Sequence, residues 1–285
     1  MNIQVVFKAV LLLQILFAHT AYANGLFDRN VVVVNYDVRT ERAFGSLPTR
    51  AQMATYVDKI QSAKPRSVAL KFFLDTEGVA ADSYLLAASM AKSRVLLQAS
   101  MNADPPVSRQ LDKRFYSDPL PSNLVPSVRG DAGWFFIAKF ADKAAKVGFV
   151  DVAAADAVPM FALFGNKPVP SFYHCILADA LNNGKDSDKF VVQNHALIFN
   201  DFKLPINDAT EVKIRLESAP LGGTISIAEV LKPDFNTAVF KDKVVVLIYT
   251  GSKSPTFLLQ GVPVKVHELF IAQLRQVFAR LQPKH

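Results

Sequence analysis

Runs of strongly apolar, mostly β-branched residues mark the segments that we expect to form buried strands. Val244 to Tyr249 is such a run, with Lys243 before it and a small-residue loop at 250–252 after it. Six apolar residues in a row, without polar alternation, are typical of a strand that is covered on both faces. We therefore predict that this segment is an interior strand of a layered sheet.

The N-terminal half alternates apolar runs with stretches of helical spacing. Strand-like runs occur at 31–36, 67–74 and 94–98. Helical spacing occurs at 50–62, where Met53, Val57 and Ile60 form the apolar side, and at 82–92. This strand, helix, strand, helix, strand order predicts parallel neighbouring strands joined by right-handed crossovers.

The middle of the chain carries shorter patterns. A Pro-rich excursion at 101–131 precedes a predicted helix at 134–145 and a predicted β-hairpin formed by 147–152 and 160–164. Further elements are expected as a helix at 171–181, strands at 196–199 and 211–216, and helices at 227–231 and 264–281. The expected fold class is α/β, with a central, mostly parallel or mixed sheet flanked by helices and a β-rich portion in the middle of the chain.

The first residues have the features of an export signal. Lys8 precedes an apolar run from Ala9 to Ala18, and Ala21 and Ala23 form a small-x-small cleavage site. We predict that residues 1–23 are a cleaved signal peptide and that residues 24–285 form one soluble domain in the periplasm. The apolar run is too short to span a bilayer comfortably.

Composition and charge narrow the possible partners. With one cysteine, Cys175, no internal disulfide can form, so a 51% hydrophobic composition must supply the core. The net charge of +7 comes from Lys and Arg that are dispersed among acids, without interleaved aromatic residues. This pattern does not indicate nucleic-acid binding, but it is compatible with peripheral contact to an anionic membrane surface.

No known catalytic motif is present. His267 and Glu268 resemble half of a zinc-protease helix, but Ile271 stands where the second histidine is required. His174 and Cys175 are adjacent on a predicted helix and point about 100° apart, so we expect a buried thiol and not a nucleophile with its base. We expect no catalytic residue, metal or cofactor.

A ligand site can be placed by topology, because open α/β sheets bind ligands at the carboxyl ends of their strands. Asp37 ends the first strand and Arg50 begins the next helix, so the two are expected to form a salt bridge or cap, or to orient a ligand. Lys71 lies on an apolar strand and is either on a solvated face, which we slightly favour, or partly buried beside a carboxylate such as Asp37. The other predicted ligand-binding residues follow the last strand: Thr250, Gly251, Ser254 and His267.

Taken in order along the chain, a set of short motifs resembles the CHASE2 family of extracytoplasmic sensor domains. They are Asp37, Gly45, Pro48, Arg50, Asp82 with Leu85, Gly148 with Phe149, Lys243, Ser254 with Pro255, Gly261 with Val262, and His267. The resemblance implies an α/β sensory module outside the cytoplasmic membrane, which in the family usually passes a signal through transmembrane helices to an output domain. The chain departs from the family at Lys71 (commonly an acid), at Asp156 to Met160 (an Asp-Gly-x-x-Arg pattern) and at Tyr249 (usually glycine).

These observations favour a stand-alone, non-catalytic periplasmic module without an output domain of its own. It would bind an unidentified small ligand, or contact a membrane-bound sensor or another envelope protein. One alternative is an interaction protein of the cell envelope that binds no ligand; another is an exported hydrolase using Asp37, Asp75 and Asp156. A pocket holding Arg50 would favour ligand binding, a filled edge beside an exposed apolar patch would favour an interaction role, and clustered carboxylates would favour catalysis.

Overall fold

The computed structural model describes residues 25–101, 111–182, 191–216, 223–259 and 261–284, so the predicted signal peptide lies outside it. Its main sheet has six strands in the order β13-β1-β14-β2-β3-β5, and all of their pairings are parallel. The strands are β1 (Val31–Tyr36), β2 (Ser67–Leu70), β3 (Val95–Ala99), β5 (Lys146–Phe149), β13 (Thr224–Ser226) and β14 (Val244–Tyr249). The α/β fold class is confirmed.

Strand β14 occupies the middle of this sheet, between β1 and β2. All six of its residues are buried, and its register with β1 runs from Val31 opposite Val244 to Tyr36 opposite Tyr249. The prediction of an interior strand is therefore confirmed. The expectation that β1 and β2 would be neighbours is wrong, because the strand without a polar face takes the place that is covered on all sides.

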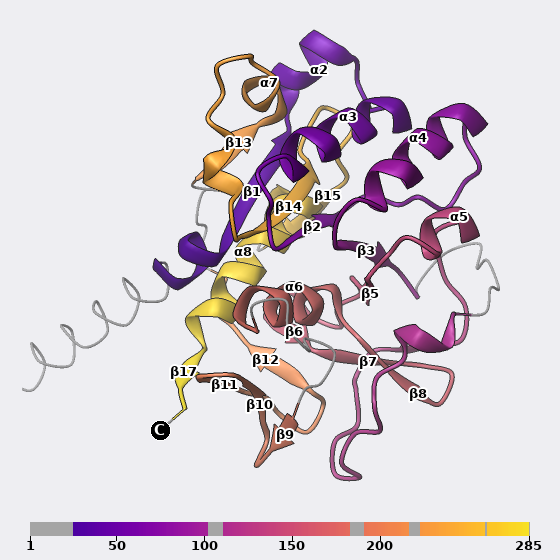
Figure 1. Ribbon diagram of the computed structural model, residues 1–285. Helices are drawn as coiled ribbons and strands as arrows, with labels where there is room; N and C mark the ends of the chain where they lie inside the picture. Colours follow the sequence, from indigo (N-terminus) through magenta and orange to yellow (C-terminus); the bar gives the residue numbers. More distant parts are fainter. Residues whose placement is uncertain (1–24, 102–110, 183–190, 217–222, 260, 285) are drawn as a thin grey trace, which may run out of the picture.

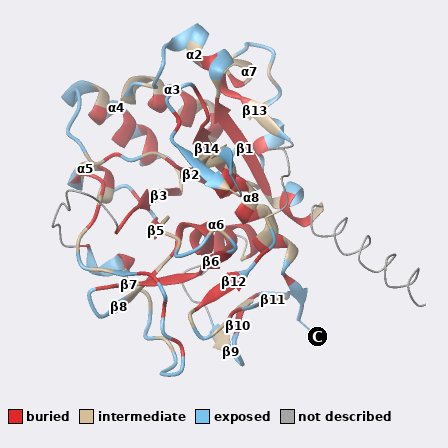
Figure 2. Cartoon of the chain, turned by 180° about the vertical axis from the view of Figure 1, so that it is seen from behind, coloured by how far each residue is buried: buried red, intermediate tan, exposed pale blue. Residues whose placement is uncertain are grey.

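Helices cover both faces of the sheet (Figure 1). The odd-numbered residues of β14 join a hydrophobic cluster with α3 (Arg50–Gln61) and α4 (Ala80–Met90). The even-numbered residues join a second cluster with α6 (Phe172–Leu181) and α8 (Val266–Ala279). Figure 2 shows the strands of this sheet buried between these two layers.

The predicted helices of the first half form as expected. Thr49 and Gln52 make a capping box at the start of α3, which satisfies backbone N–H groups that the helix itself leaves unpaired. Met53, Val57 and Ile60 are buried along its apolar side. A short helix, α2 (Val38–Phe44), precedes it and begins directly after β1.

The middle of the chain is β-rich, as expected, and builds smaller sheets beside the main one. A three-stranded sheet contains β4 (Arg129–Gly130), β7 (Phe161–Phe164) and β8 (Lys167–Pro170). A pair contains β6 (Ala157–Pro159) and β12 (Glu211–Lys213). A four-stranded sheet contains β9 (Val191–Gln193), β10 (Ala196–Phe199), β11 (Phe202–Pro205) and β17 (Gln282–Pro283).

Two predictions in this region are wrong. The expected hairpin of 147–152 with 160–164 does not form, because β5 pairs in parallel with β3 in the main sheet and β7 pairs with β4 and β8. The expected helix at 134–145 is reduced to α5 (Ala138–Ala141), since Trp134 exchanges backbone hydrogen bonds with Ser100 at 2.7 and 3.1 Å. Long-range pairing outweighs local spacing in both cases.

The remaining elements are short. They are α7 (Ile227–Val230), the 3₁₀ turns η1 (Lys113–Phe115) and η2 (Thr237–Phe240), and a two-stranded hairpin of β15 (Thr256–Leu259) and β16 (Val262–Lys265). The hairpin connects the carboxyl end of β14 to the start of α8.

Gly148 on β5 allows α6 to lie directly against the sheet. A Cβ atom at position 148 would be 2.4 Å from Phe172 Cα, where backbone atoms leave no room to move aside. We expect Gly148→Ala to lower the free energy of unfolding by at least about 2 kcal/mol, because overpacking forces the helix away from the sheet. Urea denaturation measures this.

Gly25→Ala is the matched control, because a Cβ atom at position 25 meets nothing within 4 Å. Equal urea midpoints for the two variants would contradict the close approach of α6 to β5.

Candidate functional site at the carboxyl edge of the sheet

The predicted site residues lie where β1, β14 and β2 end, side by side. The backbone N–H of Thr250 donates to the carbonyl of Tyr36 at 3.0 Å, which carries the β1–β14 pairing one residue beyond the strands. Asn35 and Thr250, 215 residues apart in sequence, exchange side-chain hydrogen bonds of 2.7 and 3.0 Å. The prediction that the last loop meets the end of the first strand is confirmed.

Asp37 caps helix α2. One of its carboxylate oxygens accepts hydrogen bonds from the Thr40 backbone and hydroxyl and from the Ser226 hydroxyl, each at 2.9 Å. Partial burial acts to raise the pKa of Asp37, but these hydrogen bonds outweigh it and hold the pKa below its ordinary value. Asp37 therefore acts as an ionised structural cap.

Arg50 holds a different segment. Its guanidinium donates to the backbone carbonyls of Thr76 and Glu77 and to the hydroxyl of Ser83 at 2.6 Å, and it lies 5.1 Å from the ring centroid of Phe140. The predicted pairing of Arg50 with Asp37 is wrong, because each group binds its own neighbours. The guanidinium of Arg50 therefore holds the loop between β2 and α4, where a ligand's polar group had been expected.

Lys71 follows β2 and is buried, with 3% of its surface exposed. Its Nζ donates to Gln98 Oε1 at 3.2 Å and lies 4.7 Å from the ring centroid of Phe270 on α8. Burial lowers the pKa of Lys71 to about 7, and the carboxylate of Asp151 only partly offsets this. The favoured expectation of an exposed side chain is wrong, and in the buried alternative Gln98 takes the place of Asp37.

Two residues of this cluster were missed by sequence reasoning. Gln98 lies on β3 near its carboxyl end, and Asp151 follows β5, where it accepts hydrogen bonds from Ser100 Oγ at 2.7 Å and Met101 N at 2.8 Å. Both are polar residues at the ends of parallel strands, and that position is the signal that could have identified them.

His267 ties the start of α8 to the end of β14. Its Nδ1 accepts the backbone N–H of Tyr249 at 2.9 Å. Burial, together with the positive charge of Lys71, lowers the pKa of His267 to about 2, so the imidazole is neutral. A neutral ring with Nδ1 as acceptor serves as a structural link.

The loop after β14 is anchored by Glu41 of α2. The Glu41 carboxylate accepts hydrogen bonds from Tyr249 Oη at 2.6 Å and from Ser252 N at 2.9 Å. Burial and this carboxylate raise the pKa of Tyr249 to about 12, which keeps the phenol protonated as the donor. A Cβ atom at Gly251 would be 2.1 Å from Glu41 Oε1, so the contact requires glycine there.

Ser254 completes the loop by donating from its hydroxyl to the Tyr249 carbonyl at 3.3 Å. The polar residues predicted to bind a ligand are thus bonded to other side chains or to backbone groups of the same chain. The ring of Tyr249 packs beside these contacts, with its centroid 6.0 Å from that of Tyr36.

The structure does not bring together the acids of the hydrolase alternative. Within the residues that the structure describes, no three His, Cys, Asp or Glu side chains gather into a group able to hold a metal ion, and Asp37, Asp75 and Asp156 form no such cluster. Cys175 is buried, and His174 packs its ring 4.8 Å from that of Phe161. No helix among these residues has the length and apolar character needed to cross a membrane.

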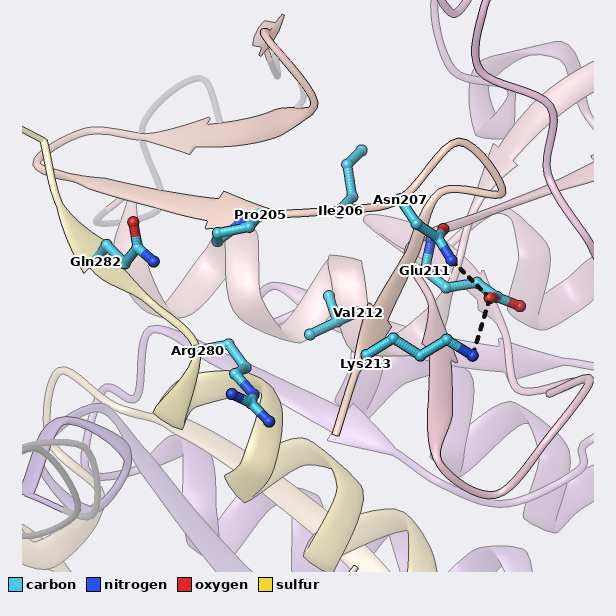
Figure 3. A pocket seen from close by; sticks show the side chains of 8 residues that line it. All are labelled: Pro205, Ile206, Asn207, Glu211, Val212, Lys213, Arg280 and Gln282. Carbon is cyan, nitrogen blue, oxygen red and sulfur yellow. Dashed lines mark hydrogen bonds and ion pairs between the residues drawn. The ribbon is translucent and has the colours of Figure 1, made fainter. Parts of the chain in front are cut away.

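An open cleft of about 400 Å³ lies elsewhere, between β11, β12 and the end of α8 (Figure 3). Glu211 in its wall accepts hydrogen bonds from Ser127 Oγ at 2.7 Å and Asn207 Nδ2 at 3.1 Å, and lies 3.9 Å from Lys213 Nζ. Arg280 lines the same cleft. It contains none of the predicted site residues.

Comparison with known protein families identifies the chain. The model of the CHASE2 domain matches residues 5–270, which is most of the sequence. The chain belongs to the CHASE2 family. CHASE2 domains are extracytoplasmic sensory domains, and the resemblance found from the short motifs is thereby confirmed. Searches of the curated proteins and of the solved structures returned no match.

Exposed apolar side chains of this CHASE2 domain concentrate at the same sheet edge. Of the thirteen large apolar side chains that are exposed in the described part of the chain, ten lie in the segments that follow β1, β2 and β14. We call these ten the apolar edge: Val38, Phe44, Leu47, Phe73, Val79, Tyr84, Leu85, Phe257, Leu258 and Val262. The same segments also expose charged side chains, among them Arg39, Arg42, Glu77 and Lys253, so the surface of the edge combines apolar and charged groups.

The buried amine of Lys71 makes stability depend on pH. The unfolded chain keeps this group protonated up to its ordinary pKa of 10.5, whereas the folded chain does so only below about 7. Between these values unfolding takes up a proton, so this group makes the unfolding free energy rise with pH by up to about 1.4 kcal/mol per unit. Lys71→Met should remove that slope and raise stability at pH 7, measured by urea unfolding between pH 7 and 9.

Lys253→Met is the control, because Lys253 is exposed and should leave the pH profile unchanged. A constant difference between wild type and Lys71→Met across this pH range would show that Lys71 keeps its ordinary pKa in the folded chain.

Proposed function

We propose that this CHASE2 domain is an exported, non-catalytic sensing module that transmits its state by contact with a membrane or envelope partner at the apolar edge. The observation that carries the proposal is the concentration of exposed apolar side chains in the three segments that follow adjacent parallel strands. Monomeric soluble proteins rarely expose large contiguous apolar patches unless these bind something.

The internal hydrogen bonds of the edge favour contact with a partner rather than binding of a ligand in an enclosed pocket. Arg50, which would have oriented a ligand, is bonded to the carbonyls of Thr76 and Glu77, and Glu41 is bonded to the loop after β14. Because these groups are already satisfied, a ligand would have to break internal hydrogen bonds to reach them. The same bonds hold the three loops in place relative to one another, as a contact surface requires.

Export is part of the proposal. The apolar run from Ala9 to Ala18 with the small-x-small site at Ala21 and Ala23 supports cleavage of residues 1–23 and delivery of the rest to the periplasm. Membership of an extracytoplasmic family supports the same location.

Site-specific photo-crosslinking tests the contact surface. The chain is produced with its own residues 1–23, the periplasmic fraction is checked for it, and a photoreactive side chain is placed at Leu47 or Val79. Both side chains are exposed, at 52% and 64%, so we expect the substituted chains to fold. We expect discrete crosslinked envelope products from both positions.

Val191 is the matched control, because it is 58% exposed but lies on β9, outside the apolar edge. Equal crosslinking from Val191 and from the edge positions, or retention of the chain in the cytoplasm, would refute the proposal.

Binding of a small ligand is the second candidate function. Lys71 favours it, since a buried amine with a pKa near 7 beside Phe270 is a group that often marks a binding site. A ligand that binds only the folded chain must raise its melting temperature. Thermal-shift screening of residues 24–285 against metabolites should then yield a hit that Lys71→Met abolishes, and no shift across a broad library would exclude this candidate.

A further inference from the structure

The β15–β16 hairpin is the part of the apolar edge with the most unusual surface. Its register pairs Phe257 with Val264 and Leu259 with Val262, which puts four apolar side chains on one face. The other face carries the pair of Leu258 with Pro263. The two outermost residue pairs of the strands are therefore apolar, one on each face of the ribbon.

The hairpin tip is free of other elements of the described chain. The ribbon forms its own two-stranded sheet, and Figure 1 places β15 beside the end of β14. Leu258 is 68% exposed and Val262 is 61% exposed, and a Cβ atom at Gly261 would meet nothing within 4 Å.

Positive charge lies at the base of the hairpin. Between Gly251 and Val266 the ionisable side chains are Lys253, which is exposed, and Lys265, whose Nζ contacts the Thr250 carbonyl. Two acids are near this base: Glu41, whose carboxylate accepts hydrogen bonds from Ser252 and Tyr249, and Glu268 in the first turn of α8. Positive charge at the base and apolar residues toward the tip complement a bilayer interface, which has anionic headgroups outside and an apolar interior beneath them.

The dimensions of the hairpin fit such a surface. The outer pair of Leu259 with Val262 lies three residue steps beyond the base pair of Thr256 with Lys265. At about 3.4 Å per residue, the apolar end extends roughly 10 Å beyond the lysine. Amphipathic segments at a bilayer interface bury their apolar part to a depth of about 5–10 Å.

A second copy of the chain fits less well. Two hairpins that paired edge to edge would satisfy backbone groups but leave both apolar faces of each ribbon in water. A lipid interface covers both faces at once.

We propose that the β15–β16 hairpin inserts its tip into the interfacial region of an anionic lipid bilayer, with Lys253 and Lys265 at the level of the lipid phosphates. This inference rests on the proposed function, since it names the partner of one part of the apolar edge. It assigns lipid contact to the segment that joins the central strand β14 to helix α8.

Vesicle co-sedimentation of residues 24–285 tests the proposal. We expect binding to vesicles of equimolar phosphatidylcholine and phosphatidylglycerol, and binding at least about tenfold weaker to phosphatidylcholine alone. The double variant Leu258→Ser/Val262→Ser should lose at least about tenfold in partitioning, because it removes the two most exposed apolar side chains of the ribbon. Lys253→Gln should lose about fivefold on the mixed vesicles.

Val191→Ser and Lys241→Gln are the matched controls, since both positions are exposed and lie outside the hairpin. Urea midpoints establish that all variants fold. Absence of vesicle binding, or equal losses from the hairpin variants and the controls, would overturn the proposal. Hairpin variants that leave vesicle binding intact but convert a dimer to a monomer in sedimentation velocity would assign the ribbon to a second copy instead.

The proposed partner contact at the apolar edge and the proposed lipid insertion of the hairpin can be refuted independently. Crosslinks from Leu47 and Val79 to an envelope protein, combined with no vesicle binding, would leave the sensing function standing and remove lipid as the partner.

Discussion

Parallel pairing of β14 with β1 along six residues is the constraint on which the rest of this CHASE2 domain depends. It places Tyr249 opposite Tyr36, so that the loops that begin at Asp37 and Thr250 emerge together although more than half of the chain separates them. β2 flanks β14 on the other side and adds Lys71 and the loop held by Arg50 to the same edge. The pairing is stable because β14 has no polar face, and only a site between two strands and two helical layers removes all of its side chains from water.

The polar groups at this edge serve the architecture first. Asp37 caps α2, Arg50 binds loop carbonyls, Glu41 holds the loop after β14, and His267 joins α8 to Tyr249. Each satisfies a backbone or side-chain group that would be costly to leave unpaired near the core. These polar groups are bonded internally, and ten exposed apolar side chains lie in the segments after β1, β2 and β14, which is why we assign contact to this surface.

Both departures from the family pattern that fall on this edge have visible structural consequences. Tyr249, where the family usually has glycine, covers the sheet edge with its ring and reaches Glu41 with its hydroxyl. Lys71, where the family commonly has an acid, is buried against Phe270, and Gln98 accepts its hydrogen bond. Both side chains pack at the carboxyl end of the central strands.

Sequence alone determined the features that depend on neighbouring residues: the α/β class, helix α3 with its apolar side, and β14 as an interior strand. Periodicity and apolar runs encode these because they reflect which side chains must leave water. It also placed the edge, since loops after parallel strands lie on one side of a sheet. Only the tertiary structure decided the hydrogen-bond partners of Asp37, Arg50 and Lys71. It also decided the insertion of β14 between β1 and β2, and the pairing of the strands within 147–164. These depend on which distant backbone lies within hydrogen-bond reach, and on packing such as that of Gly148 against Phe172, which local patterns do not record.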